Sequence, residues 1–201
     1  MLDFLLNYTN SSIIAAIIAC AISLSNLVYY VFTMFRGRTK PHLYTWLIWG
    51  VITWVIAVIQ TIEGETVGAW LTYTVAAACT VRALLAISYG EKDITKSDRI
   101  SLLSCLIAII AWIVFKQPLL SVLLLTFIDL VGYYPTFRKS WHKPQEEAVI
   151  SHLVFGIGYM FGVIALSEYN FVTATYPVAV MLSSYIFVIY VLIRRYVTTR
   201  N

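Results

Sequence analysis

Seven long apolar runs, separated by short polar stretches, constrain this chain more than any other feature. They lie at residues 11–35, 43–62, 67–89, 100–115, 119–137, 149–167 and 174–196. An α-helix of about 20 apolar residues spans the hydrocarbon core of a bilayer. A soluble domain has about a quarter of its residues charged, whereas the charged fraction here is 12% and the hydrophobic fraction 60%. The sequence therefore predicts an all-α integral membrane protein with seven transmembrane helices, a multi-pass protein of the cell (plasma) membrane surrounded by the lipid bilayer.

The basic residues predict the orientation of these helices, because short cytoplasmic loops are enriched in lysine and arginine. Of the 14 lysines and arginines, all except Arg82 and Lys116 lie on one side of the predicted membrane. The stretches on the other side hold Lys116 and four acidic residues, which are Asp3, Glu63, Glu65 and Glu168. This asymmetry predicts that the N-terminus is outside the cell and the C-terminus is in the cytoplasm.

The two halves of the chain resemble each other when one is shifted by 103 residues without a gap. Lys40-Pro41 then falls on Lys143-Pro144, and Thr72-Tyr73 falls on Thr175-Tyr176. We therefore predict a duplication, with a three-helix repeat at 1–89, a linker helix and its loops at 90–118, and a second three-helix repeat at 119–201. The linker helix returns the second repeat to the orientation of the first, so the repeats are parallel.

This 3+1+3 pattern, with its N-terminus outside, resembles the SWEET and PQ-loop superfamily of membrane proteins. The segment Tyr134-Pro135-Thr136-Phe137-Arg138-Lys139 is similar to the superfamily's proline and basic turn, although the superfamily has glutamine where Thr136 stands. The stretch from Arg38 to Trp49 more closely resembles an uncharacterised bacterial group with a Thr-Lys-Pro, Thr-Trp and Trp signature. The resemblance implies a small-solute site between two helix triplets and does not specify the solute.

Two ionisable residues lie within predicted spans, where a charge costs at least about 2.5 kcal/mol and needs a partner or a watery cavity. Asp129 is eight residues from Phe137 and Arg82 is seven from Tyr89, so both lie at nearly the same depth and are able to pair. In one interpretation Asp129 binds a proton or a cation, and Arg82 tunes its charge. In the other, a purely structural ion pair fixes the register of two helices.

Other polar and aromatic residues inside the spans are candidates for a pore or substrate site. Together with the two charged residues, these candidates are Asn26, Trp54, Gln60, Tyr73, Arg82, Asp129, Tyr133, His152, Tyr176 and Tyr185. Under the repeat, Asn26 matches Asp129 and Tyr185 matches Arg82. Tyr73 and Tyr176 also match, and they either line the pore or pack there. Trp46 and Trp49 follow the basic loop and are predicted as interfacial anchors.

Pro135 and Pro177 lie inside predicted helices, where proline removes a backbone hydrogen bond and bends the helix. The family resemblance associates the first-helix proline of a triplet with rocking, so Pro135 is a candidate hinge or gate, and Pro177 is a second candidate. A static kink is the alternative at both positions. Gly156, Gly158 and Gly162 give the sixth predicted helix a small-residue face suited to close packing.

The leading functional prediction is a transporter or facilitator of a small polar solute, working by alternating access between two triple-helix bundles, with proton coupling through Asp129 as a variant. The alternative is a non-transporting receptor or sorting protein that uses the same cavity. An enzyme is not predicted, because no nucleophile, base and orienting group share one depth. The cysteines and histidines lack metal-ligand spacing, so no metal or cofactor is predicted, and the scattered basic residues argue against nucleic acid. A monomer and a homo-oligomer both fit the sequence.

Overall fold

A computed structural model describes residues 2–37, 41, 43–90, 96–115, 117–133, 137, 140–141, 144–146 and 149–200. Within these residues the protein has seven long α-helices, a short 3-10 helix and no strand. The elements are α1 (Leu2–Phe35), α2 (Leu43–Ile62), α3 (Ala69–Tyr89), α4 (Lys96–Phe115), α5 (Pro118–Gly132), η1 (Pro144–Glu146), α7 (Val149–Ile164) and α8 (Phe171–Arg200). The prediction of an all-α fold is confirmed.

Four segments are long and apolar enough to cross a membrane, namely Asn10–Phe35, Leu43–Ile62, Ala69–Tyr89 and Phe171–Thr199. Two further helices, α5 and α7, are apolar but shorter. Large apolar side chains point outward from the bundle, for example Ile17, Leu84 and Ile186, which are 55%, 61% and 58% exposed. Such a surface suits lipid tails far better than water, and it is typical of a membrane protein.

Helix boundaries follow the predicted runs most closely for α2, which has the predicted limits, and differ elsewhere. Helix α1 begins at Leu2 rather than at residue 11, because neither proline nor glycine interrupts residues 2–10. Its 34 residues make a helix about 51 Å long, well beyond the roughly 30 Å hydrocarbon core of a bilayer. Helix α7 ends at Ile164, before the predicted residue 167, because the chain turns there toward the connection between α2 and α3.

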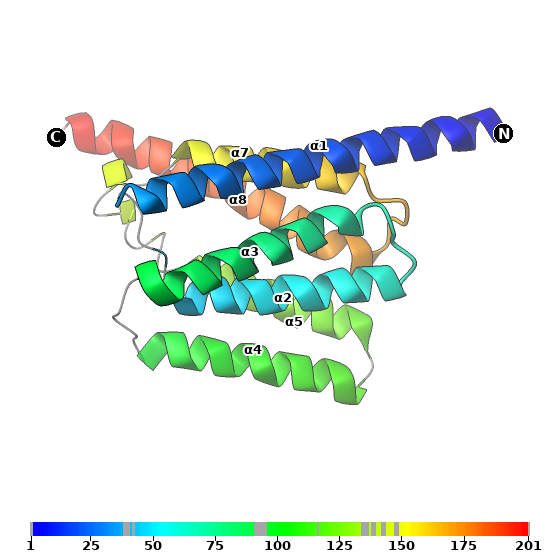
Figure 1. Ribbon diagram of the computed structural model, residues 1–201, viewed down its shortest axis with the longest axis horizontal. Helices are drawn as coiled ribbons and strands as arrows, with labels where there is room; N and C mark the ends of the chain where they lie inside the picture. The colour runs from blue at the N-terminus through cyan, green and yellow to red at the C-terminus, as the bar shows by residue number, and fades with distance from the viewer. Residues whose placement is uncertain are drawn as a thin grey trace.

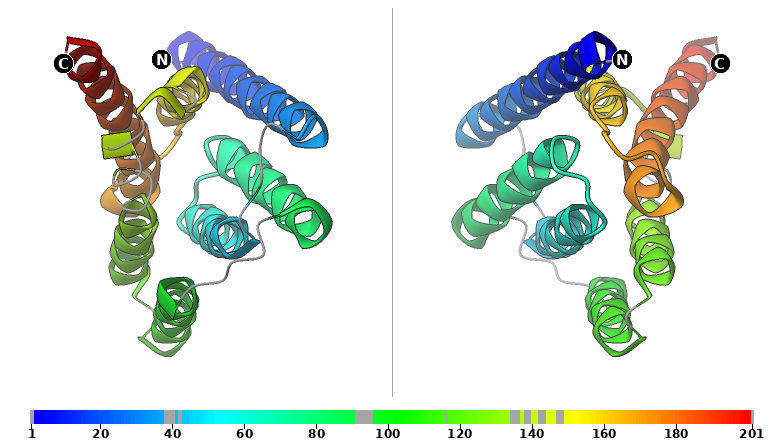
Figure 2. Two further views of the ribbon diagram at one scale, coloured as in Figure 1. Left: turned by 90° about the vertical axis from the view of Figure 1, so that its left-hand side faces the viewer. Right: turned by 90° about the vertical axis from the view of Figure 1, so that its right-hand side faces the viewer.

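The helices form two groups that lie side by side. In the first group α3 packs against α1 and α2, and in the second group α8 packs against α5 and α7. Between the groups, α1 contacts α7, α2 contacts both α5 and α8, and α3 contacts α7. Figure 1 shows the helices running along one direction with the chain termini at opposite ends of the bundle. The end-on views in Figure 2 show α4 at the edge, where it packs on α5 and α2.

Glycines on α7 allow the two groups to approach closely. A Cβ atom at Gly162 would collide with Leu71 of α3, and one at Gly158 would lie 3.3 Å from Ile22 of α1. At Gly156, a Cβ atom would lie 2.9 Å from the ring of Tyr185 on α8. These distances confirm the predicted small-residue face. The buried core beside it includes Leu71 and extends to Ile52 and Ile56 of α2.

Candidate functional site

A small cavity lies where the two helix groups meet, and Asp129 of α5 forms part of its wall. Its volume is about 30 Å³, enough for one or two water molecules. Residues of five helices line it, namely Trp49, Thr53, Val75, Cys79, Asp129, Tyr133, Phe155, Tyr176 and Val180. Three of the predicted site residues, Asp129, Tyr133 and Tyr176, are thus brought together. The cavity is the candidate functional site.

The carboxyl group of Asp129 is buried, with 4% of the residue exposed. Its Oδ1 accepts a hydrogen bond of 3.5 Å from the hydroxyl of Tyr176 on α8. No described lysine or arginine forms an ion pair with it. A carboxylate offers about four acceptor positions, so this single long bond leaves most of its capacity unused. The uncompensated acid is the chemically distinctive group of the site.

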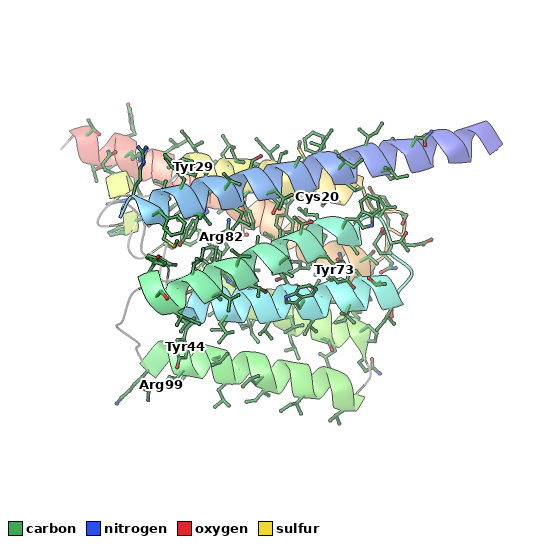
Figure 3. The ribbon with its side chains drawn as sticks, in the orientation of Figure 1. Cys20, Tyr29, Tyr44, Tyr73, Arg82 and Arg99 are labelled. Carbon is green, nitrogen blue, oxygen red and sulfur yellow. The ribbon has the colours of Figure 1, made fainter. Side chains whose placement is uncertain are left out.

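Arg82 does not pair with Asp129, and the prediction of an ion pair between them is wrong. The guanidinium carbon of Arg82 lies 4.6 Å from the ring centroid of Trp46 and 5.0 Å from that of Tyr30. Aromatic faces attract a cation at such distances, and the residue is only 6% exposed. Figure 3 shows Arg82 between α1 and α3. Counting residues along the helices placed both charges at one depth, but the rotation of α3 turns Arg82 toward Tyr30 of α1 and Trp46 of α2 instead of α5.

Trp46 and Trp49 of α2, which are predicted as interfacial anchors, pack against the core of the bundle. Both rings are partly buried against the core. The Nε1 atom of Trp46 donates a 3.2 Å hydrogen bond to the hydroxyl of Tyr30, and the ring of Trp49 lies 5.9 Å from that of Tyr133. Tyr133 also packs on His152 of α7, at a centroid distance of 6.1 Å. The cavity is therefore bounded by an aromatic cluster that joins both groups.

Asn26 lies near the cavity but faces α7. Its Oδ1 accepts a 3.2 Å hydrogen bond from the hydroxyl of Ser151. Asn26 also lines a smaller hollow of about 10 Å³ beside the ring of Tyr159. The hydroxyl of Tyr159 is buried without a hydrogen-bond partner. Its ring lies 6.2 Å from that of Tyr176, which lines the cavity. The Tyr159 hydroxyl is therefore a second buried polar group close to the cavity.

The predicted site residues Trp54, Tyr73 and Tyr185 lie away from the cavity. Trp54 is 43% exposed on the outer face of α2, where its Nε1 donates to the hydroxyl of Thr80. Tyr73 packs on the ring of Trp54 and forms a hydrogen bond with Thr61, so it stays on the same face. Tyr185 lies between α7 and α8, with its hydroxyl 3.9 Å from the sulfur of Met160. The repeat pairs Tyr73 with Tyr176 in sequence, but only Tyr176 reaches Asp129.

Gln60 bonds to a backbone carbonyl of α8 that Pro177 leaves without its helical partner. A proline has no N–H to donate, so Pro177 leaves the carbonyl of Thr173, four residues earlier, without its helical partner. The side-chain Nε2 of Gln60 on α2 donates a 2.9 Å hydrogen bond to that carbonyl. Gln60 is fully buried. Gln60 and Pro177, chosen separately from the sequence, thus act on the same carbonyl, that of Thr173. The other predicted hinge, Pro135, lies outside the described residues.

Glu65, for which the sequence analysis predicts no role in the site, joins the two groups at one end of the bundle. This turn end consists of the α2–α3 connection at 63–68 and the α7–α8 connection at 165–170. Glu65 is fully buried. Its carboxylate accepts hydrogen bonds from the N–H groups of Gly68, Ser167 and Glu168 at 2.7, 2.7 and 2.9 Å, and from the Ser167 hydroxyl at 2.8 Å. No signal in a single sequence marks an acidic residue for burial in a turn.

The opposite end of the bundle carries basic residues. Arg36 follows α1, Arg99 lies near the start of α4, and Arg194 lies near the end of α8. Figure 3 shows Arg99 pointing away from the bundle at this end. We call it the basic end. The carboxylate of Glu65 and the guanidinium group of Arg99 thus lie at opposite ends of the helices.

The fold and site together define an all-helical protein of membrane character with a buried acid between two helix groups. No metal-binding group of three or more His, Cys, Asp or Glu side chains occurs in the described part of the chain. Comparison with known proteins finds no matching family model, no matching curated protein and no matching solved structure.

Proposed function

We propose that this protein is a seven-span membrane transporter or facilitator of a small polar solute, with the cavity beside Asp129 as its solute site. Alternating access would come from movement of the first helix group, α1 to α3, against the second, α5, α7 and α8. Helix α4 serves as the linker. This is the architecture expected of the SWEET and PQ-loop superfamily, which the sequence resembles.

Contacts between the helices support the duplication on which this proposal rests. The shift of 103 residues carries α1 onto α5, α2 onto α7 and α3 onto α8. The α1–α7 contact then corresponds to the α5–α2 contact, and the α2–α8 contact corresponds to the α7–α3 contact. The contacts between the groups thus form two matched pairs, as expected when two parallel repeats are related by an axis between them.

Charge at the two ends of the bundle supports the orientation. Basic residues gather at the basic end, which we assign to the cytoplasm, and the acidic turn end faces outside. The N-terminus is then outside and the C-terminus inside, in agreement with their separation in Figure 1. This arrangement needs an odd number of crossings. The four longer spans together with α4, α5 and α7 make seven.

Asp129 is the observation that carries the proposal. An ionisable group within the hydrocarbon region is costly and is retained mostly where it takes part in a solute, ion or proton pathway. Asp129 lies beside a cavity at the junction of the two groups, and no described cation neutralises it. A structural ion pair with Arg82, which was the competing explanation from the sequence, is not formed.

Contacts at the turn end support alternating access. The Glu65 carboxylate and the Gln60 amide of the first group both bond to backbone atoms of the second group. These bonds hold the two groups together at the turn end, which the proposal assigns to the outside. Under this proposal, opening toward the outside requires these bonds to break.

The test is solute flux into liposomes that contain the purified protein, with sugars, amino acids, nucleosides, vitamins and amines as radiolabelled solutes. We expect saturable flux of one class, lost in Asp129→Asn and kept in Glu168→Gln, a matched change at an exposed acid of the turn end. Saturable binding without flux would instead support a receptor. If no solute class shows either binding or flux, the proposed function is overturned.

A further inference from the structure

The wall of the central cavity has a composition that selects the charge of its ligand. Aromatic side chains from α2, α7, α8 and the residue that follows α5 line it, namely Trp49, Phe155, Tyr176 and Tyr133. One ionisable acid, Asp129, is set among them. Electron-rich ring faces attract cations and offer nothing to an anion. The wall therefore complements one positive charge.

The charge around Asp129 leads to the same conclusion. Among the described residues, the titratable groups near it are the Tyr176 hydroxyl of α8, the Tyr159 hydroxyl of α7, the Cys79 thiol of α3 and the neighbouring Tyr133. None of these is a cation, and α2 contributes Trp49 and Thr53, which do not titrate. A buried carboxylate is stable only when its charge is neutralised. A single proton or a single monovalent cation fulfils that requirement.

The type of cation follows from the number of oxygen atoms. Hard metal cations such as Ca²⁺ and Mg²⁺ take about six or more oxygen ligands in proteins. The cavity wall is mostly aromatic and aliphatic, and its oxygens come from Asp129, Thr53 and two tyrosines. Aromatic walls with one acid suit an organic ammonium group, whose methyl or methylene hydrogens spread the charge over the ring faces.

We propose that the solute is a small organic ammonium ion, held between Asp129 and the surrounding aromatic rings, and that it exchanges with one proton on the same carboxyl group. This inference rests on the proposed transport function and adds the chemical class of the solute. The ammonium ion binds the ionised carboxylate, so the proton leaves Asp129 as the ion arrives. On the other side of the membrane the ion leaves and a proton returns. One positive charge moves each way, and the exchange is electroneutral.

The size of the cavity indicates which state of this cycle the structure describes. A volume of about 30 Å³ accepts one or two water molecules, which is too little for an ammonium ion with methyl groups. The contracted cavity suits the proton-bearing carboxyl. The solute-bearing state requires the two groups to move apart at Asp129, so the proton and the ammonium ion favour different arrangements.

Binding to the purified full chain in detergent tests the solute class. The probes are choline and its neutral isostere 3,3-dimethylbutan-1-ol, measured by calorimetry at pH 8 and pH 5.5. We expect choline to bind at pH 8, to bind severalfold more weakly at pH 5.5, and to be lost in Asp129→Asn, while the isostere does not bind. Glu168→Gln should bind choline as the wild type does. Equal binding of the isostere, or choline binding that is unaffected by Asp129→Asn, would overturn the proposal.

A second variant keeps the test decisive if Asp129→Asn does not fold. Trp49→Leu removes one ring face and leaves the carboxylate intact, and it should weaken choline binding about tenfold. Unchanged affinity in Trp49→Leu would contradict the aromatic site. No choline or tetramethylammonium binding to the folded wild type at either pH would also refute the solute class.

Flux measurements separate this inference from the proposed function. In liposomes with a pH-sensitive dye inside, the lumen should become more alkaline as choline enters and more acidic as choline leaves. The membrane potential should not change. Choline binding without flux would keep the site and reject transport. Flux of a neutral or anionic solute, with no choline flux, would keep transport and reject the ammonium class.

Discussion

The side-chain amide of Gln60 on α2 donates a 2.9 Å hydrogen bond to the backbone carbonyl of Thr173 on α8. That carbonyl has no helical partner because Pro177 stands four residues later. The Thr173 carbonyl that Pro177 leaves unpaired in the second group therefore binds a side chain of the first group. Gln60 is fully buried, so water does not compete for the bond.

Gln60→Leu should lower the free energy of unfolding by about 1–3 kcal/mol, because it leaves the Thr173 carbonyl buried without a donor. Pro177→Ala restores an N–H group within α8, so the loss caused by Gln60→Leu should be smaller in that background. Denaturant unfolding of the four proteins in detergent measures both effects. An equal loss in the two backgrounds would show that the carbonyl of Thr173 does not need Gln60.

Glu65→Gln should loosen the turn end. Glutamine offers one acceptor oxygen and an NH₂ group, which would face the N–H donors of Ser167 or Glu168, so about 1–3 kcal/mol of stability should be lost. The readout is labelling of a cysteine at Leu166, which is fully buried there, by a membrane-impermeant maleimide in a background without native cysteines.

Glu168→Gln is the matched control for Glu65→Gln, since Glu168 occupies the corresponding position of the repeat and its side chain is exposed. We expect faster labelling in Glu65→Gln and unchanged labelling in Glu168→Gln. Identical labelling rates in the two variants would mean that the Glu65 hydrogen bonds do not hold the turn end closed.

Asp129→Asn and Arg82→Gln should have additive effects on stability, within about 0.5 kcal/mol, because the two side chains share no hydrogen bond or ion pair. Arg82→Gln and Trp46→Leu should be non-additive by about 0.5–2 kcal/mol, since the guanidinium group lies on that ring. Double-mutant cycles on unfolding in detergent measure both couplings. A large coupling between Asp129 and Arg82 would restore the ion-pair interpretation.

Cysteine labelling of intact cells should reveal the orientation. In a background without native cysteines, a cysteine at Thr66, exposed at the turn end, should react with an impermeant maleimide added outside. A cysteine at Lys96, exposed at the start of α4, should react only after permeabilisation. The opposite pattern would reverse the orientation, and labelling of both from outside would mean that α3 does not cross the membrane.

The sequence by itself determined the helices, because the apolar run that predicts each helix lies within the segment that forms it. Apolar runs of suitable length define α2 and α3 almost to the residue, and the glycines of α7 mark a face for close packing. A buried acid in an apolar run identified Asp129 as a candidate without any knowledge of its neighbours. Tyr176 lies 47 residues from Asp129 along the chain, and it was named as a candidate only through the repeat.

Only the tertiary structure decided which neighbours these residues meet. The rotation of each helix about its axis turned Arg82 toward Trp46 and Tyr30, and it left Trp54 on the outer surface. The duplicated acids Glu65 and Glu168 match in sequence, yet only the first is buried between the turns. Counting residues along a helix specifies how deep a residue lies, whereas contacts between distant helices, set by close packing, specify what its side chain touches.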